Sequence, residues 1–282
     1  MNNLLKDLEF LYDEMTESHK KVAQYVMENI ENIAFYTLDE LANKIGVSTT
    51  TVIRFARNLG YAGYSDFLEE VQKVIKAKVG LPERLSVSLE NVNHDQLLLD
   101  SFNQDIINIK ATLEGLSPDK LDKAIDMIMA AKNVYVIGLR TSFSLAHSFA
   151  MSLGQIRENV RLIQGAGSSY PEECLGVGPD DLCVSFTFPR HARVTLEITG
   201  WMKKRGTKVI AITQSLLSPI VEFADIILPC EVKGIMFKHS MAAPLCLINY
   251  LVAGVAVRDE EEAMRVLSKT EQLLRQFHYF GV

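Results

Sequence analysis

The stretch GVSTTTVIRFARNLGY, residues 46–61, combines three threonines and two arginines with apolar residues at helical spacing. Thr50, Arg54 and Arg57 recur at intervals of four and three, so their side chains point in one direction. The apolar residues mark the opposite side of the same helix: Val52, Phe55, Ala56 and Leu59. Three successive β-branched residues gain nothing on a merely solvated helix face. The stretch therefore predicts a helix with one side in a core and the other facing a partner.

A second short helix is expected just before this stretch. In YTLDELANKIGVS, residues 36–48, the apolar residues Leu38, Leu41, Ala42 and Ile45 share one side. Gly46 can take the positive φ that ends a helix, and the Ser48 hydroxyl can cap the next one. Two short helices joined at a glycine turn, with donors near the N-terminus of the second, are the sequence form of helix-turn-helix.

The predicted DNA-contacting side chains lie on and near the second helix. Its first turn would reach base edges or phosphates, and arginines pair with guanine edges or phosphates. Residues 41–60 contain no acid, although the whole chain carries a net charge of −6. The positive charge is thus local to the proposed DNA-reading face, which comprises Lys44, Ser48, Thr49, Thr50, Thr51, Arg54, Arg57 and Asn58. The alternative is a three-helix domain with an ordinary solvated face.

The segment LYDEMTESHKKVAQYVMENIENIAFYTLDELANKIGVSTTTVIRFARNLGYAGYSDFLEEV, residues 11–71, resembles the N-terminal domain of RpiR-type bacterial transcription regulators. It contains V-S-x-x-T-V-x-R at residues 47–54 and L-G-Y-x-G-Y-x-x-F at residues 59–67. In that family this domain binds operator DNA, and a C-terminal sugar isomerase (SIS) domain senses a metabolite, usually a phosphosugar. The resemblance implies operator DNA and a small-molecule effector as partners.

Composition divides the chain into three parts. We expect a helix-turn-helix DNA-binding domain at residues 1–77, a linker and connecting helix at 78–116, and an SIS-like effector-binding domain at 117–282. GLPERLSVSLENVNHD, residues 80–95, lacks a clear period and favours a loose connection. Helical spacing then returns, and predicts a helix that joins the second domain or a dimer interface: Leu99, Phe102, Ile106, Ile109 and Leu113.

The last part alternates apolar runs with helical stretches. The five runs are VYVIG, VRLIQ, LCVSF, KVIAIT and DIILPC, separated by helices such as residues 144–157 and 194–204. Continuous rather than alternating apolar runs predict strands covered on both faces. The predicted fold is therefore an all-α helix-turn-helix domain followed by an α/β three-layer domain with a five-stranded parallel sheet.

Ligands of such sheets bind where the strands end. After the first run, Arg140, Thr141 and Ser142 stand at a helix start, where free amides and the helix dipole favour an anion. This loop resembles the first phosphate loop of an SIS domain, and Ser142 matches the family's hydroxyl ligand. An ordinary strand-to-helix turn explains the glycine before it, Gly138, nearly as well.

The end of the third run departs from the family. SIS domains usually have S-x-S-G-x-T here, whereas residues 185–198 are SFTFPRHARVTLEI. Alignment of the strand places the following residues on that motif: Thr187 on the first serine, Pro189 on the second, Arg190 on the glycine and Ala192 on the threonine. Most of the hydroxyl cradle is missing.

Three side chains stand in its place: Arg190, His191 and Arg193. The loop resembles an RpiR subgroup with S-F-P-R-Y-S-R at this position. Guanidinium groups grip carboxylate or phosphate in pairs, so the effector is expected to be anionic. The alternative is that both arginines cap helix ends or meet acids at a dimer interface.

Motifs for other chemistry are missing. There is no G-x-x-x-x-G-K-[ST], H-E-x-x-H or G-x-S-x-G, and we predict no catalytic residue, metal ligand or cofactor. Four cysteines without a C-x-x-C pair predict reduced, buried thiols, and no apolar run reaches the roughly 18 residues of a membrane span. We therefore expect a cytoplasmic protein.

Three functional hypotheses follow. The first is a metabolite-responsive regulator, a dimer or tetramer on a palindromic operator, which senses a phosphosugar, a sugar acid or a related metabolite. The second is an SIS-type sugar-phosphate isomerase or deaminase whose helical domain serves only assembly. The third is a constitutive DNA binder.

Overall fold

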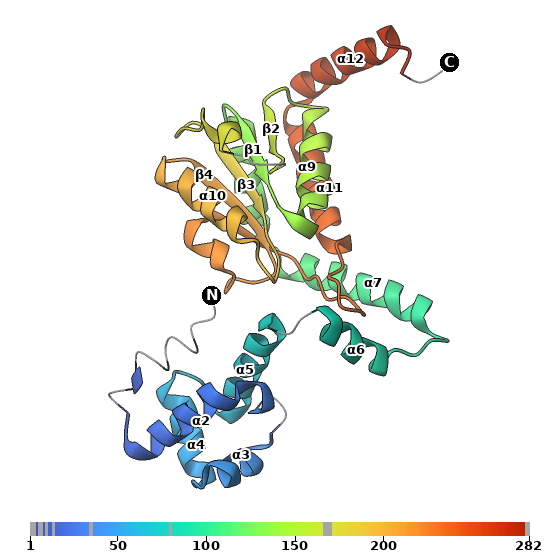
Figure 1. Cartoon of the computed structure of the whole chain (residues 1–282). Helices are drawn as coiled ribbons and strands as arrows, with labels where there is room; N and C mark the ends of the chain where they lie inside the picture. The colour runs from blue at the N-terminus through green and yellow to red at the C-terminus, as the bar shows by residue number, and fades with distance from the viewer. Residues whose placement is uncertain are drawn as a thin grey trace. The chain divides into compact units, whose positions relative to one another are not determined.

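The computed structural model describes Leu4, Leu8 and residues 11–12, 15–33, 36–78, 81–165 and 171–279. The chain divides into two compact units, Met1–Arg84 and Leu85–Val282. Figure 1 colours the first from blue to cyan and the second from green to red. The domain boundaries predicted from the sequence, at residues 77 and 116, remain predictions. Residues 80–95, expected as a loose connection, include the whole of a helix, α6 (Leu81–Asn91).

The first unit consists of helices packed around one apolar cluster. Its elements are α2 (Glu17–Ile33), α3 (Leu38–Ile45), α4 (Thr49–Asn58) and α5 (Tyr64–Lys78). Phe55 of α4 lies at the centre, where its ring contacts that of Phe67 edge-on with centroids 5.8 Å apart. Val52 and Ala56 are buried beside it, whereas Leu59 is half-buried. The apolar side predicted for residues 46–61 is confirmed.

The turn between α3 and α4 has the predicted chemistry. Gly46 adopts φ 75°, and its N–H donates to the carbonyl of Ala42 at 2.9 Å. The hydroxyl of Ser48 accepts from the N–H of Thr51 at 3.1 Å as the N-cap of α4. At the other end of α3, Thr37 and Glu40 form a capping box that fixes where this helix begins.

The second unit is built on a five-stranded parallel sheet, as predicted, and its strand order is β2-β1-β3-β4-β5. The strands are β1 (Val134–Ile137), β2 (Val160–Ile163), β3 (Leu182–Phe186), β4 (Lys208–Thr213) and β5 (Ile226–Pro229). The helices are α7 (Leu97–Gly115), α8 (Pro118–Ala130), α9 (Phe143–Gly154), α10 (Arg193–Lys204), α11 (Ala242–Arg258) and α12 (Glu260–Gln276). Short 3-10 helices follow three strands: η2 (Arg140–Ser142), η3 (Glu172–Cys174) and η4 (Pro219–Phe223).

Both faces of the sheet are covered. On one face, Phe149 of α9 and Leu251 of α11 join a large core with Phe186 of β3. On the other face, Ile198 and Met202 of α10 complete a smaller core. Figure 1 shows α9 and α11 together on one side of the sheet and α10 on the other. The three-layer prediction is confirmed.

The cysteines depart from expectation at one position. Cys174, Cys183 and Cys230 are buried and form no disulfide among the described residues, and burial raises the pKa of Cys183 to about 12. Cys246 is exposed on α11, so the prediction of a buried thiol was wrong there. The almost wholly apolar sequence of α11 conceals which of its sides faces outward.

No single helix among the described residues is long and apolar enough to cross a membrane, and α11 with α12 meets that test only as a pair bent by 107°.

We predict that Gly46→Ala lowers the free energy of unfolding of the first unit by about 1–2 kcal/mol, because a side chain is strained at φ 75°. Gly63→Ala is the matched control: Gly63 has no positive φ, and a Cβ there would meet nothing within 4 Å. Urea denaturation followed by circular dichroism measures both. Equal stabilities of the two variants would contradict this account of the turn.

Candidate functional site

The outward side of α4 carries the predicted DNA-reading face. Thr50, Arg54 and Arg57 are exposed, on the side of the helix away from Val52 and Phe55. Thr50 and Arg54 make no hydrogen bond or ion pair with any of the described residues, so both side chains are available to a ligand. The structure thus brings a threonine hydroxyl and a guanidinium together on one uncovered helix face.

Other members of the predicted set have structural partners. The hydroxyls of Ser48 and Thr51 lie 2.9 Å apart within the cap. Nε of Arg57 donates to the carbonyl of Ala62 at 3.3 Å, and the Lys44 ammonium lies 4.9 Å from the centroid of the Tyr36 ring. Thr49 is half-buried. These residues therefore shape the helix-turn-helix, whatever contacts they add to DNA.

Sequence reasoning missed the support that α2 gives to this face. The side chain of Asn58 is 3.2 Å from Nδ1 of His19, and the His19 ring packs edge-on against Phe55 at 5.9 Å. The two residues of this hydrogen bond are 39 positions apart, so no local pattern could reveal it. Asn58 ties the end of α4 to the start of α2.

The first predicted effector loop forms a tight turn after β1. Ser142 is buried, whereas Arg140 and Thr141 are exposed. A Cβ at Gly138 would lie 2.7 Å from the carbonyl oxygen of Ser142, so this approach requires glycine. Arg140 itself adopts φ 57°, in the left-handed region. The turn thus presents Arg140 outward through a strained backbone.

The loop after β3 contains a contact between two polar side chains, the buried Thr187 and the half-buried His191. Oγ1 of Thr187 lies 3.0 Å from Nδ1 of His191. Burial is the largest of the causes that lower the pKa of His191 to about 4, and the charge of His239 contributes to the same shift. The His191 imidazole is therefore neutral at pH 7. His239 lies in the segment between β5 and α11, so this segment reaches the same edge of the sheet as the loop.

Arg190 stands where the family motif has glycine, and it adopts φ 66°. Its side chain is exposed. A non-glycine residue with positive φ costs about 1–3 kcal/mol and persists where the surrounding structure enforces it. Because β1 and β3 are neighbours in the sheet, two exposed arginines with left-handed backbones, Arg140 and Arg190, follow adjacent strand ends.

Arg193 differs from these two arginines. Its Nε donates to Oε1 of Glu197 at 2.6 Å, one turn along α10, and both side chains are largely exposed. This contact resembles the alternative in which the arginine meets an acid, although the acid is on its own helix. An exposed pair of this kind contributes little to stability, so Glu197 can release Arg193 to a ligand at small cost.

A buried hydroxyl lies at the start of α10. Oγ1 of Thr195 is buried and has no hydrogen-bond partner among the described residues. One turn further along α10, Oγ1 of Thr199 donates to the carbonyl of Thr195 at 2.8 Å and lies 3.0 Å from Oγ of Ser185. Sequence reasoning did not single out these three residues, because buried helix threonines carry no motif.

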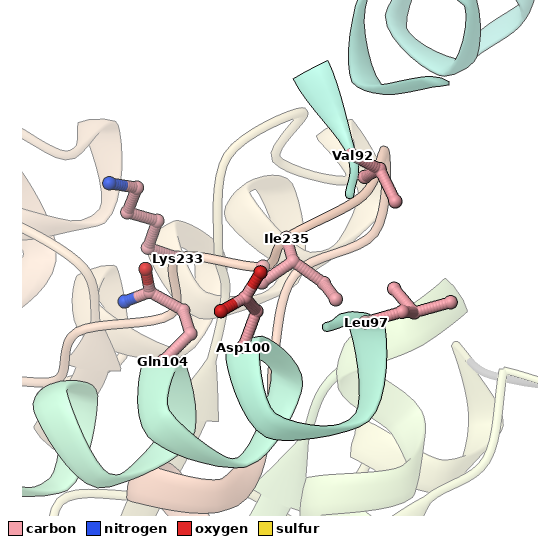
Figure 2. A pocket seen from close by; sticks show the side chains of 7 residues that line it. Val92, Leu97, Asp100, Gln104, Lys233 and Ile235 are labelled. Atoms are coloured by element: carbon pink, nitrogen blue, oxygen red, sulfur yellow. The ribbon is translucent and has the colours of Figure 1, made fainter. Parts of the chain in front are cut away.

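Two further features complete the second unit. A small pocket of about 250 Å³ lies between the start of α7 and the segment after β5, and Figure 2 shows Asp100 and Gln104 of α7 beside Ile235 and Lys233. None of the predicted effector residues lines this pocket. Within the described parts of the chain, no group of three or more His, Cys, Asp or Glu side chains could hold a metal ion.

Comparison with known families agrees with both units. Residues 2–78 match the family described as "Helix-turn-helix domain, rpiR family", and residues 127–253 match the SIS domain family. The transcriptional regulator HexR of Pseudomonas aeruginosa is 24 % identical over 267 residues, which cover 92 % of this chain and 90 % of that protein.

Solved structures give the same result. The sugar isomerase domain of an RpiR transcription factor from Sphaerobacter thermophilus is 27 % identical, with a TM-score of 0.61, and the match covers 63 % of this chain and 99 % of that one. The Vibrio vulnificus NanR protein complexed with ManNAc-6P has a TM-score of 0.59 at 20 % identity, covering 98 % and 99 %. These matches define a helix-turn-helix transcriptional regulator with an SIS domain. The chain belongs to the RpiR family.

We predict that the ring of His191 titrates with a pKa of about 4. The pKa in the unfolded chain is 6.5, so the neutral ring's contribution to stability is present above pH 6.5 and is lost as the pH falls towards 4. Titration of the ring by NMR checks the value, and His191→Gln should remove this part of the pH dependence. A midpoint near 6.5 would contradict the prediction, because it would mean that the surroundings of the ring do not disfavour its charged form.

Proposed function

We propose that this regulator binds operator DNA through the exposed face of α4 and senses a small anionic, carbohydrate-derived metabolite at the carboxyl ends of β1 and β3. The observation that carries the proposal is the pair of exposed arginines with positive φ, Arg140 and Arg190, at two adjacent strand ends. Both residues keep a backbone strain that glycine would relieve. A side-chain function at this edge accounts for that strain.

The chemistry of the edge supports an anion. A guanidinium group donates two parallel hydrogen bonds to a carboxylate or phosphate. The helix that follows η2 directs free amides towards the same edge, and Thr195 adds an unpartnered hydroxyl at the start of α10. Ser142 and Thr187 line the two turns. These groups suit a negatively charged ligand with hydroxyls, such as a phosphosugar or a sugar acid.

The relatives support the same class of ligand. NanR of Vibrio vulnificus has been solved with the sugar phosphate ManNAc-6P. In this chain Pro189, Arg190 and Ala192 replace hydroxyl or glycine positions of the family motif. Recognition here therefore depends on charge more than on a cradle of hydroxyls, and both carboxylates and phosphates are candidates.

Sensing without turnover is the proposed activity. An isomerase working through an enediol needs a base with a pKa near the working pH. His191, which lies at this edge, has a pKa of about 4 and holds a hydrogen bond to Thr187, so it is a poor base at pH 7. The protein would act in the cytoplasm, on operator DNA, as a dimer or tetramer whose paired reading helices contact half-sites about 34 Å apart or a multiple of that.

For the DNA-reading face, we predict that Arg54→Ala and Thr50→Ala each weaken operator binding by about 1–3 kcal/mol if the side chain contacts a base. Loss of a phosphate contact would instead weaken binding to all sequences alike. Fluorescence anisotropy with an operator selected from random oligonucleotides, and with a scrambled duplex, separates the two results. Arg275→Ala, a surface arginine of α12, is the control. Unchanged affinity of both variants at normal thermal stability would refute this face.

For the effector edge, we predict that Arg190→Gly stabilises the fold by about 1–2 kcal/mol, because glycine relieves the strain at φ 66°. The same variant should bind the effector at least about tenfold more weakly, since a charge-assisted hydrogen bond contributes about 1.5–3 kcal/mol. Operator binding without effector should not change.

Thermal-shift screening against sugar phosphates, sugar acids and neutral sugars identifies the ligand, and calorimetry measures its affinity. Lys208→Ala, at the opposite end of β4, is the control variant. An effector that is neutral, or that binds Arg190→Gly normally, would mean that the arginine has a structural role only.

A further inference from the structure

The pocket beside the start of α7 belongs neither to the DNA-reading face nor to the effector edge. It is formed within the second unit, by α7, by Val92 just before that helix and by the segment after β5. Its volume of about 250 Å³ is below the roughly 300–1,000 Å³ of pockets that hold drug-sized ligands. The pocket therefore has room for a ligand of about the size of an amino acid.

The two walls of this pocket are tied to each other. Gln104, Asn108 and Thr112 recur every four residues and form the polar stripe of α7, and Asn108 and Thr112 are buried. Nδ2 of Asn108 donates to the carbonyl of Lys233 at 2.7 Å, and Oγ1 of Thr112 accepts from the N–H of Glu231 at 2.9 Å. The polar stripe thus holds the segment after β5, and the apolar stripe of α7 faces outward.

The segment after β5 folds back on itself where it forms the pocket wall. A Cβ at Gly234 would overlap the carbonyl oxygen of Lys238, so this turn requires glycine. Figure 2 shows the Asp100 carboxylate and the Gln104 amide pointing from α7 towards the part of the segment that carries Ile235. The pocket is therefore already formed in the single chain, with polar groups on one wall.

Two oxygen acceptors stand together on the α7 wall. Asp100 and Gln104 are one turn apart, so their side chains share one face of the helix. Nε2 of Gln104 donates to Oδ1 of Asn108 at 3.1 Å, which leaves the amide oxygen to accept from a ligand. The Asp100 side chain lines the pocket and makes no hydrogen bond or ion pair with any of the described residues. A carboxylate and an amide oxygen side by side suit an ammonium group, which has three N–H donors.

The other lining residues add a positive charge and an apolar surface. Lys233 is exposed and forms no ion pair among the described residues, and Figure 2 shows its ammonium directed away from Asp100. Val92, Leu97 and Ile235 supply the apolar part of the lining. A simple amine would meet the charge of Lys233 uncompensated, and a simple acid would meet that of Asp100. A ligand with both charges and an apolar group satisfies all of these residues.

We propose that this pocket binds a small α-amino acid with an apolar side chain, its ammonium on Asp100 and Gln104 and its carboxylate on Lys233. The ligand would bridge α7 and the segment after β5. The same segment reaches the effector edge at His239. The pocket would therefore give the regulator a second small-molecule input, and it does not depend on the ligand proposed for the effector edge.

Calorimetric titration of L-valine, L-leucine and L-methionine into the full chain, without DNA or sugar ligands, tests the proposal. We expect at least one of them to bind with a dissociation constant below about 1 mM. NMR of the Ile235 methyl group, assigned with Ile235→Val, shows whether the ligand enters this pocket. Isoamylamine lacks the carboxylate of leucine and 4-methylpentanoate lacks its ammonium. Each should bind at least about tenfold more weakly than leucine, because each loses charge-assisted hydrogen bonds.

Substitutions test the two charges separately. Asp100→Asn and Lys233→Met should each weaken amino-acid binding at least about tenfold, and the second keeps the backbone carbonyl that Asn108 holds. Asp105→Asn, the same change at a position of α7 that does not line the pocket, is the matched control and should bind normally. Circular dichroism checks that each variant is folded.

Three results would overturn the proposal. The first is an Ile235 methyl group that responds to none of the three amino acids at millimolar concentration. The second is an amine or acid that binds as tightly as leucine, which the unmodified chain alone can reveal. The third is equal binding by the Asp100→Asn and Asp105→Asn variants.

Discussion

Burial of the parallel sheet on both faces is the constraint on which the second unit depends. β3 and β4 lie between α9 and α11 on one face and α10 on the other. Each connection between parallel strands must cross a face of the sheet, so all five strands end at the same edge. Arg140 and Arg190 are 50 positions apart in the sequence, yet both follow neighbouring strand ends. The position of the candidate effector site follows from the architecture.

The segment between β5 and α11 connects this edge to α7. Its first residues, Glu231 and Lys233, hold the polar stripe of α7 through backbone hydrogen bonds. Further along, His239 is close enough to His191 to lower its pKa. One short segment therefore contacts both the loop after β3 and the helix that carries the outward apolar stripe. Such a shared element is what an allosteric protein needs if a ligand at one place is to favour one arrangement of the other.

Much of the fold was predictable because its signals are local. Helical spacing, Gly46 and Ser48 give the helix-turn-helix, and five uninterrupted apolar runs give the parallel sheet. For the candidate effector site, the sequence predicted only that it lies where the strands end. The Thr187–His191 contact and the Asn58–His19 contact depend on packing. The spacing of Leu99, Phe102 and Ile106 predicted a stripe, but periodicity alone does not say whether a stripe faces its own core, and here the buried Asn108 decides that it faces outward.

The central claim is that effector and operator act on one conformational equilibrium of this regulator. Calorimetric titration of the effector into the full chain, with and without operator, tests it most directly. Linkage requires that operator change the affinity for effector by the same factor by which effector changes the affinity for operator, typically about 5- to 150-fold. The account predicts two equal factors clearly different from one. An effector that binds with the same affinity with and without operator would contradict it.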